Sequence, residues 1–271
     1  MGYMKTSKIL SFLIVTALLV SSCGGDDPAS SDDPDPPSLP EFSNIEADIS
    51  YFEQNAPSKA ANNNFNNAKN YALGLSGVST LSQSYLAFLS SANNTEAEYN
   101  NGQWTWEYSY GYQGQSATVK LVAQETSGMM NWGMFLSVDD GAGNSFEDYK
   151  IFEGSVATDG SSGTWTFNSL NSDGTTEVPV LETTWEKFSD TNVEINTDIY
   201  ENGTDQVLNY TYVRDGSVYD MTYTSNDTNN SIYIHWETDA RTGYYQIGDD
   251  ASNRLCWDDG LADVDCSSLG Y

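Results

Sequence analysis

Basic residues are scarce in this sequence, and histidine and cysteine are scarcer still. The 271 residues include 10 Lys plus Arg, one His and three Cys, against 39 Asp plus Glu. Because nucleic-acid binding depends on cations placed at phosphates, this balance excludes nucleic acid as a partner. One histidine and three cysteines also argue against a four-ligand zinc site. After residue 23, no apolar run approaches the ~20 residues that a membrane-spanning helix needs.

The first 22 residues have the pattern of a secretory signal peptide. Lys5 and Lys8 supply a positive region, and the apolar run over residues 9–20 is too short to span a membrane. The run ends in Val20-Ser21-Ser22-Cys23, which resembles the lipobox of bacterial lipoproteins. This resemblance implies cleavage before Cys23, attachment of diacylglycerol to its sulfur, and acylation, typically by palmitate, of the new amine.

Two other interpretations of the N-terminus remain open. Cys23 could be an ordinary residue of a cleaved signal, and the start Met1-Gly2-Tyr3-Met4-Lys5-Thr6 matches an N-myristoylation pattern. We prefer the lipobox, because its position, the run length and the small residues all agree with it. Two or three acyl chains on one cysteine would anchor the protein permanently, since each buried methylene contributes about 0.8 kcal/mol.

The segment after the cysteine is predicted to be a tether. Residues 23–41 carry the lipidated cysteine and an acidic stretch rich in Gly, Asp, Ser and Pro, which is too polar to fold alone. Asp26-Asp27 resembles the surface-export signal of lipoproteins of the Bacteroidota, although a generic solvated linker has the same composition. Gly24 stands where the inner-membrane retention signal of enterobacterial lipoproteins has aspartate. We therefore expect an outer-membrane lipoprotein on the periplasmic or the cell-surface face.

The predicted domains are thus a signal peptide over 1–22, the tether over 23–41, and a single β-rich domain with N-terminal helices over 42–271. Removal of the signal leaves 8 basic against 39 acidic residues, a formal net charge of −31. Such a surface favours solubility and disfavours adhesion to anionic lipid. Calcium binding or adaptation to salt is one interpretation of this acidity, and simple solubility is the preferred one.

Two or three helices are predicted at the start of the folded domain. The first begins at a capping box formed by Ser43 and Glu46, continues through Phe52, and ends before Pro57. Helical spacing of apolar residues predicts a second helix and a third, which runs from residue 80 to about residue 90. The apolar face of the second helix consists of Phe65, Ala68, Ala72 and Leu75.

From Gly102 the apolar residues alternate with polar ones, which predicts strands. The clearest segments are 104–112, 119–123, 130–138, 165–167, 193–199, 208–212, 219–223, 232–236 and 245–247. Asp-Gly or Asn-Gly pairs at 159–160, 173–174, 202–203 and 215–216 favour tight hairpins. The spacing predicts ten or eleven strands. The fold class is mainly β: a long antiparallel meander forming a curved sheet or incomplete barrel, with the helices packed against it.

Three groups of residues are candidate sites. Cys256 and Cys266 are expected to form a disulfide, because the chain is exported. An aromatic ladder could bind a hydrophobic or glycan ligand, although core packing is the preferred interpretation. The ladder consists of Trp104, Trp106, Tyr108, Tyr110 and Trp132. An acidic group around the cysteine pair could bind Ca²⁺, but its spacing is not that of an EF-hand, and solvated turns are preferred. This group consists of Asp258, Asp259, Asp263 and Asp265, and a second acidic loop contains Asp139, Asp140 and Asn144.

No catalytic residue can be singled out from the sequence. His235 could act as a general base, but an ordinary strand histidine is the preferred interpretation, and no Gly-x-Ser-x-Gly elbow is present. We expect a non-catalytic lipoprotein that binds a ligand or partner through its antiparallel sheet. One alternative is a carbohydrate-active surface protein, either a glycan-binding module or a two-carboxylate glycosidase. Another is a structural or assembly lipoprotein with no small ligand. No cofactor other than Ca²⁺ is implied.

Overall fold

The computed structural model divides the chain into two units, Met1–Asp35 and Pro36–Tyr271, and the second carries every helix and strand named below. The structure describes residues 34–39, 46–56, 63–80, 89, 92, 95–112, 115–139, 141, 145–171, 174–201, 203, 205–226 and 230–271. For residues 78–80, 112 and 115 only the backbone is described. Cys23, Ser43, Pro57, Asp140, Asn144 and residues 81–88 lie outside these ranges.

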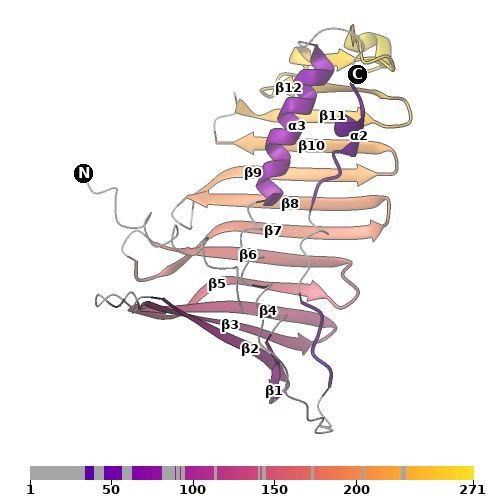
Figure 1. Cartoon of the computed structure of the whole chain (residues 1–271). Helices are drawn as coiled ribbons and strands as arrows, with labels where there is room; N and C mark the ends of the chain where they lie inside the picture. The colour runs from indigo at the N-terminus through magenta and orange to yellow at the C-terminus, as the bar shows by residue number, and fades with distance from the viewer. Residues whose placement is uncertain are drawn as a thin grey trace, which may run out of the picture. The chain divides into compact units, whose positions relative to one another are not determined.

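Alternating side chains build one antiparallel sheet in which each strand pairs with its neighbours in the chain (Figure 1). Within the described residues the strands are β1 (Glu98–Asn100), β2 (Gln103–Tyr112), β3 (Gln115–Thr126), β4 (Met129–Asp139), β5 (Ser145–Ala157), β6 (Ser162–Leu170), β7 (Glu177–Ser189), β8 (Asn192–Glu201), β9 (Asp205–Asp215), β10 (Val218–Ser225), β11 (Ile232–Glu237), β12 (Thr242–Ile247), β13 (Leu255–Trp257) and β14 (Asp263–Val264). The predicted antiparallel meander is confirmed, and the sheet is open, with β1 and β14 at opposite edges.

The predicted strand number was wrong, because fourteen strands lie in the described residues rather than ten or eleven. The two long strands that alternation did not indicate are β5 and β7. The pairing of β5 with β4 shifts register at two places, which in β4 lie between Met134 and Phe135 and between Leu136 and Val138. The side chains of β5 therefore do not keep a strict period of two. In β7 the buried position between Leu181 and Trp185 is a threonine, which breaks the apolar alternation.

The two faces of the sheet differ in chemistry. Cross-strand partners share a face, and one row of partners runs through eleven strands on the aromatic face. This row consists of Trp104, Ala123, Trp132, Gly154, Trp165, Thr183, Thr197, Tyr210, Tyr223, Ile232 and Ile247. Most of the buried strand residues belong to this face. The opposite face, called the polar face below, carries mainly threonine, asparagine and acidic residues.

Tryptophan rings on the aromatic face lie over glycines of neighbouring strands. Gly154 pairs with Trp165, and Gly163 pairs with Trp185. A methyl group at either glycine would overlap the tryptophan ring opposite. The two indoles stack with their centroids 6.3 Å apart, and both are buried. Glycine at these positions therefore lets a large ring lie flat across the adjacent strand.

Helix α3 (Asn64–Thr80) packs against β12 and β13 and confirms the second predicted helix, whose four apolar residues are all buried. Helix α2 (Ser50–Gln54) has one turn and begins later than predicted, because Glu46–Ile49 precede it in non-helical conformation. Phe52 and Phe65 join these helices to Trp257 by ring contacts of 6.2 and 5.8 Å. The 3₁₀ helices η3 (Ala251–Asn253) and η4 (Cys266–Leu269) flank the last strands.

Candidate binding surface

The centre of the polar face is a row of hydroxyl and amide side chains. Each is partly exposed, whereas most residues of the row on the opposite face are buried. The row consists of Ser155, Thr164, Thr184, Asn196, Thr211, Thr222 and Tyr233. Since a strand turns successive side chains to opposite faces, the same strands that bury tryptophan and tyrosine present these groups to water.

Two pairs of like-charged residues flank this row on β7 and β8. Glu182 lies opposite Asp198, and Glu186 lies opposite Glu194. Like charges in directly opposed positions destabilise a sheet. The Asp198 carboxylate accepts hydrogen bonds from the amides of Gln206 at 2.6 Å and Asn209 at 2.7 Å, which offset part of this repulsion. The acidic composition of the chain is therefore displayed on this face.

His235 lies on the polar face within a closed polar cluster. Its Nδ1 lies 2.8 Å from an oxygen of Asp220, and its Nε2 lies 3.7 Å from an oxygen of Glu237. The imidazole stacks on Tyr244 and meets the edge of Tyr271, each at a centroid distance of 5.2 Å. The side chain is 16% exposed. This arrangement fixes the ring between strands and leaves a substrate little access to it.

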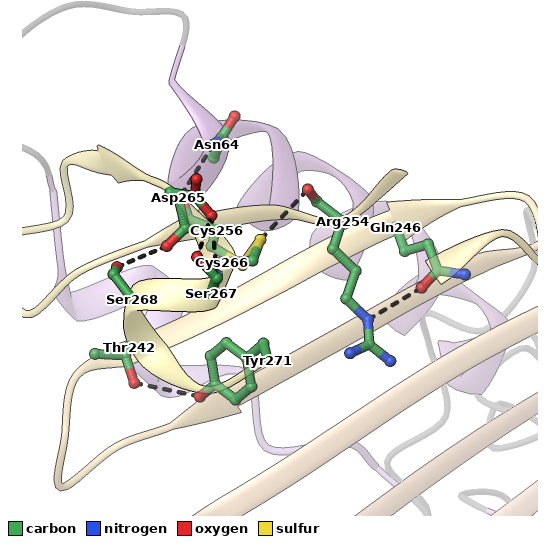
Figure 2. Close-up of a disulfide and its surroundings, with 10 residues drawn as sticks. All are labelled: Asn64, Thr242, Gln246, Arg254, Cys256, Asp265, Cys266, Ser267, Ser268 and Tyr271. Atoms are coloured by element: carbon green, nitrogen blue, oxygen red, sulfur yellow. Dashed lines mark hydrogen bonds between the residues drawn. A yellow bond between two sulfur atoms is a disulfide. The ribbon is translucent and has the colours of Figure 1, made fainter. Parts of the chain in front are cut away.

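The predicted cysteine pair forms a disulfide that holds η4 against the sheet (Figure 2). Cys256 is fully buried in β13, and Cys266 begins η4. Beyond this bond, the Tyr271 hydroxyl lies 3.3 Å from the Thr242 hydroxyl and 3.2 Å from a Glu237 oxygen. The disulfide thereby keeps residues 266–271 beside His235.

The predicted aromatic ladder lies on the aromatic face, and its tryptophans are not available for stacking on a sugar. Trp104, Trp106 and Trp132 are 8%, 4% and 6% exposed, and Trp106 stacks on Trp132 at 5.9 Å. Tyr110, at 39%, is the exposed member, and burial raises the pKa of the Tyr108 hydroxyl. The burial of the tryptophans agrees with core packing.

Three carboxylates of the predicted acidic group near the disulfide accept separate, local hydrogen bonds. Asp258 accepts from the backbone N–H groups of Gly260 and Ala262, and Asp263 accepts from that of Asn64. Asp265 caps η4, and hydrogen bonds from Ser267 lower the pKa of its carboxyl group. Among the described residues, no group of three or more His, Cys, Asp or Glu side chains is placed to hold a metal ion.

Two shallow clefts open on the described surface, and both have polar linings. One, of about 360 Å³, lies at the β1–β2 edge and is lined by Glu98, Asn100, Asn101, Gln103, Thr105 and Gln124. The other, of about 370 Å³, is lined by Ser50, Tyr51, Gln54, Asn55, Tyr219, Thr238 and Arg241. Neither lining offers the apolar wall that an acyl chain requires.

Sequence reasoning did not single out Arg241, the one cation in either lining. One feature of the sequence could have drawn attention to it. Arg241 occupies the short connection between β11 and β12, where turn residues such as glycine or asparagine are usual. Its partners in the cleft come from a helix almost 200 residues earlier, and no local pattern could have indicated them.

No protein-family model, curated protein or solved structure matches this chain. Within the described residues, no helix combines the length and apolar character needed to cross a membrane.

Proposed function

We propose that this protein is a non-catalytic lipoprotein, anchored through Cys23 in the outer membrane, which binds a ligand or partner with the polar groups of its curved sheet. The observation that supports this proposal is the division of one sheet into a buried aromatic face and a partly exposed polar face. Because the aromatic face is largely buried and stabilises the fold, the polar face and the cleft rims are the surfaces available to bind a ligand or partner.

Among the possible ligand classes, polar molecules are favoured over acyl chains. Both clefts present amide and hydroxyl groups, and the tryptophans that could have lined an apolar pocket are buried. These groups suit the hydroxyls of a saccharide. A glycan-binding module is therefore the second candidate, and it is compatible with lipid anchoring at the cell surface.

The anchoring part of the proposal is tested by metabolic labelling with palmitate in a host of the Bacteroidota. The full chain should be labelled and should fractionate with the outer membrane, and Cys23→Ser should abolish both properties. A Cys256→Ser/Cys266→Ser double variant is the matched control, because it removes two sulfurs and keeps the lipobox. Protease treatment of intact cells then distinguishes the surface from the periplasmic face. An unlabelled wild-type chain would refute the anchor.

The binding part is tested separately, by native mass spectrometry of the mature chain released from its host membrane in detergent. We expect a co-purifying polar ligand, which mild unfolding should release. A chain that carries no ligand and binds none from fractionated envelope glycans would contradict a binding role and favour a structural one.

A further inference from the structure

The cleft around Arg241 joins elements that are far apart in the sequence. Ser50, Tyr51 and Gln54 belong to α2, and Arg241 belongs to the turn between β11 and β12. The Tyr51 hydroxyl donates a hydrogen bond of 3.0 Å to the Arg241 carbonyl, and it accepts one of 3.2 Å from the buried Trp257 indole. Both bonds fix the cleft wall, so the cleft is part of the packed structure.

Arg241 differs from most other basic residues of this acidic chain in its surroundings. Four basic side chains have a carboxylate oxygen at 2.7–3.6 Å, namely Lys120, Lys150, Lys187 and Arg214. Arg241 is exposed, and in the described part of the chain no carboxylate pairs with it. Its guanidinium donates one long hydrogen bond, of 3.4 Å, to the Asn55 side-chain oxygen. Since a guanidinium has five N–H donors, most remain for a ligand.

The backbone of Arg241 adopts a conformation that is uncommon for arginine. Its φ angle is +59°, in the left-handed region that glycine and asparagine adopt most readily. Either residue would relieve this backbone and would keep the carbonyl that Tyr51 binds. Arginine therefore occupies a position whose backbone favours glycine or asparagine.

The remaining cleft wall is neutral and rich in hydrogen-bonding groups. Gln54, Asn55 and Thr238 contribute amides and a hydroxyl, and Tyr219 contributes a ring that stacks on Trp236 at 5.0 Å. Asp48, which precedes α2, is occupied, because it accepts from the Ser50 hydroxyl at 2.6 Å and lies 3.6 Å from Arg214. Glu53 belongs to α2 and Asp239 to the connection that holds Arg241, and neither is a lining residue. Among the described residues, no carboxylate belongs to the lining.

We propose that this cleft binds a sugar acid, with the ligand carboxylate on the Arg241 guanidinium and the sugar hydroxyls on the amide and hydroxyl wall. A guanidinium fork matches a carboxylate in two parallel hydrogen bonds. A singly charged ligand also suits the predicted mature chain, of net charge −31 without residues 1–22, better than a phosphate dianion does, because the field of the protein repels anions in proportion to their charge. This inference rests on the non-catalytic binding function proposed above and names its ligand class.

The test is calorimetric titration of the detergent-released mature chain with glucuronate and galacturonate, with glucose and galactose as neutral probes. We expect the uronates to bind, and the neutral sugars to bind at least tenfold more weakly. Arg241→Asn should weaken uronate binding at least tenfold without lowering the melting temperature, because asparagine tolerates the backbone and keeps the carbonyl. The control is Lys187→Gln, since Lys187 is exposed, pairs with Asp190 at 2.9 Å and is not a lining residue of the cleft.

Equal binding of neutral and acidic sugars, unchanged binding by Arg241→Asn, or equal loss in Lys187→Gln would each overturn the proposal. The wild-type chain failing to bind any uronate would do the same. These results are separable from failure of the proposed function, because palmitate labelling and co-purification of a different ligand do not depend on Arg241.

Discussion

At the scale of single residues, packing on the aromatic face depends on glycines, which have no side chain, as much as on the large rings that lie over them. Gly154 leaves the space in which the Trp165 ring lies over β5. Trp165 in turn is in ring contact with Phe152 at 5.5 Å and with Trp185 at 6.3 Å. A change at one glycine should therefore disturb several large rings, since protein interiors have little free volume.

We predict that Gly154→Ala destabilises the protein by about 1–3 kcal/mol, the usual cost of overpacking a core. The added methyl would overlap the Trp165 ring and lie 2.5 Å from the Thr164 carbonyl oxygen. The measurement is urea unfolding followed by tryptophan fluorescence. The matched control is Gly74→Ala in α3, where nothing lies within 4 Å of the new methyl. It should stabilise the helix by up to about 1 kcal/mol. Equal effects of the two variants would contradict the packing argument.

At the scale of elements, the disulfide fastens a short 3₁₀ helix that has no buried residue of its own. η4 contains four residues, and none of them is buried. Its position depends on the bond from Cys266 to Cys256 in β13 and on the Asp265 cap. The position of the Tyr271 ring then depends on where η4 lies, and so does its hydroxyl contact with Thr242 (Figure 2). Its contact with Glu237 depends on η4 in the same way.

We predict that reduction of this disulfide lowers the free energy of unfolding by roughly 2–3 kcal/mol, the value that loop entropy gives for a loop of this length. Thermal melts with and without a phosphine reductant measure the change. Amide hydrogen exchange should accelerate at Ser268, Gly270 and Tyr271, whose N–H groups bond within this segment. A Cys256→Ser/Cys266→Ser variant should behave like the reduced protein and should not respond to reductant. Unchanged exchange at these amides would show that the segment is held by other contacts.

At the scale of the whole domain, buried tyrosine phenols make the free energy of unfolding depend on pH in the alkaline range. Burial raises the pKa of Tyr210 and Tyr212, and the Tyr210 hydroxyl has no hydrogen-bond partner within the described residues. In the unfolded chain these phenols ionise near pH 10. Above that pH the unfolded chain loses protons that the folded chain retains, so the free energy of unfolding falls as pH rises. Below pH 10 both states are protonated, and this contribution is constant.

We therefore predict that the urea midpoint of the wild-type chain declines between pH 9.5 and 11.5, the window that begins at the unfolded pKa of about 10. Tyr210→Phe should reduce the slope, because it removes one such phenol, and it should not destabilise the protein at pH 7, because no hydrogen bond is lost. Absorbance at about 295 nm, where tyrosinate absorbs, measures the ionisation of the phenols, which should occur at higher pH in the folded chain than in the unfolded chain. An identical slope in the variant would exclude Tyr210 as a contributor.

The sequence by itself determined the class of the fold and much of its order. Alternation from Gly102, together with Asp-Gly turns such as 159–160 and 215–216, indicates hairpins in chain order, because a period of two and a tight turn are local properties. The four apolar residues of α3 likewise follow from helical spacing, and two cysteines ten residues apart indicate one short loop. The pattern around Cys23 that resembles a lipobox is also local, and both the lipobox and lipidation there stay predictions.

Only the tertiary structure decided which side chains share a surface. It placed Trp104 and Trp132 in the core and set Gly154 beneath Trp165, because these relations depend on register between strands. It also brought Tyr51 to Arg241 across 190 residues. Such contacts form where helix and sheet pack together, and no sequence period records them. The composition of the chain therefore predicts an acidic protein, whereas the cleft around Arg241, the one cation among its described lining residues, exists only in the folded state.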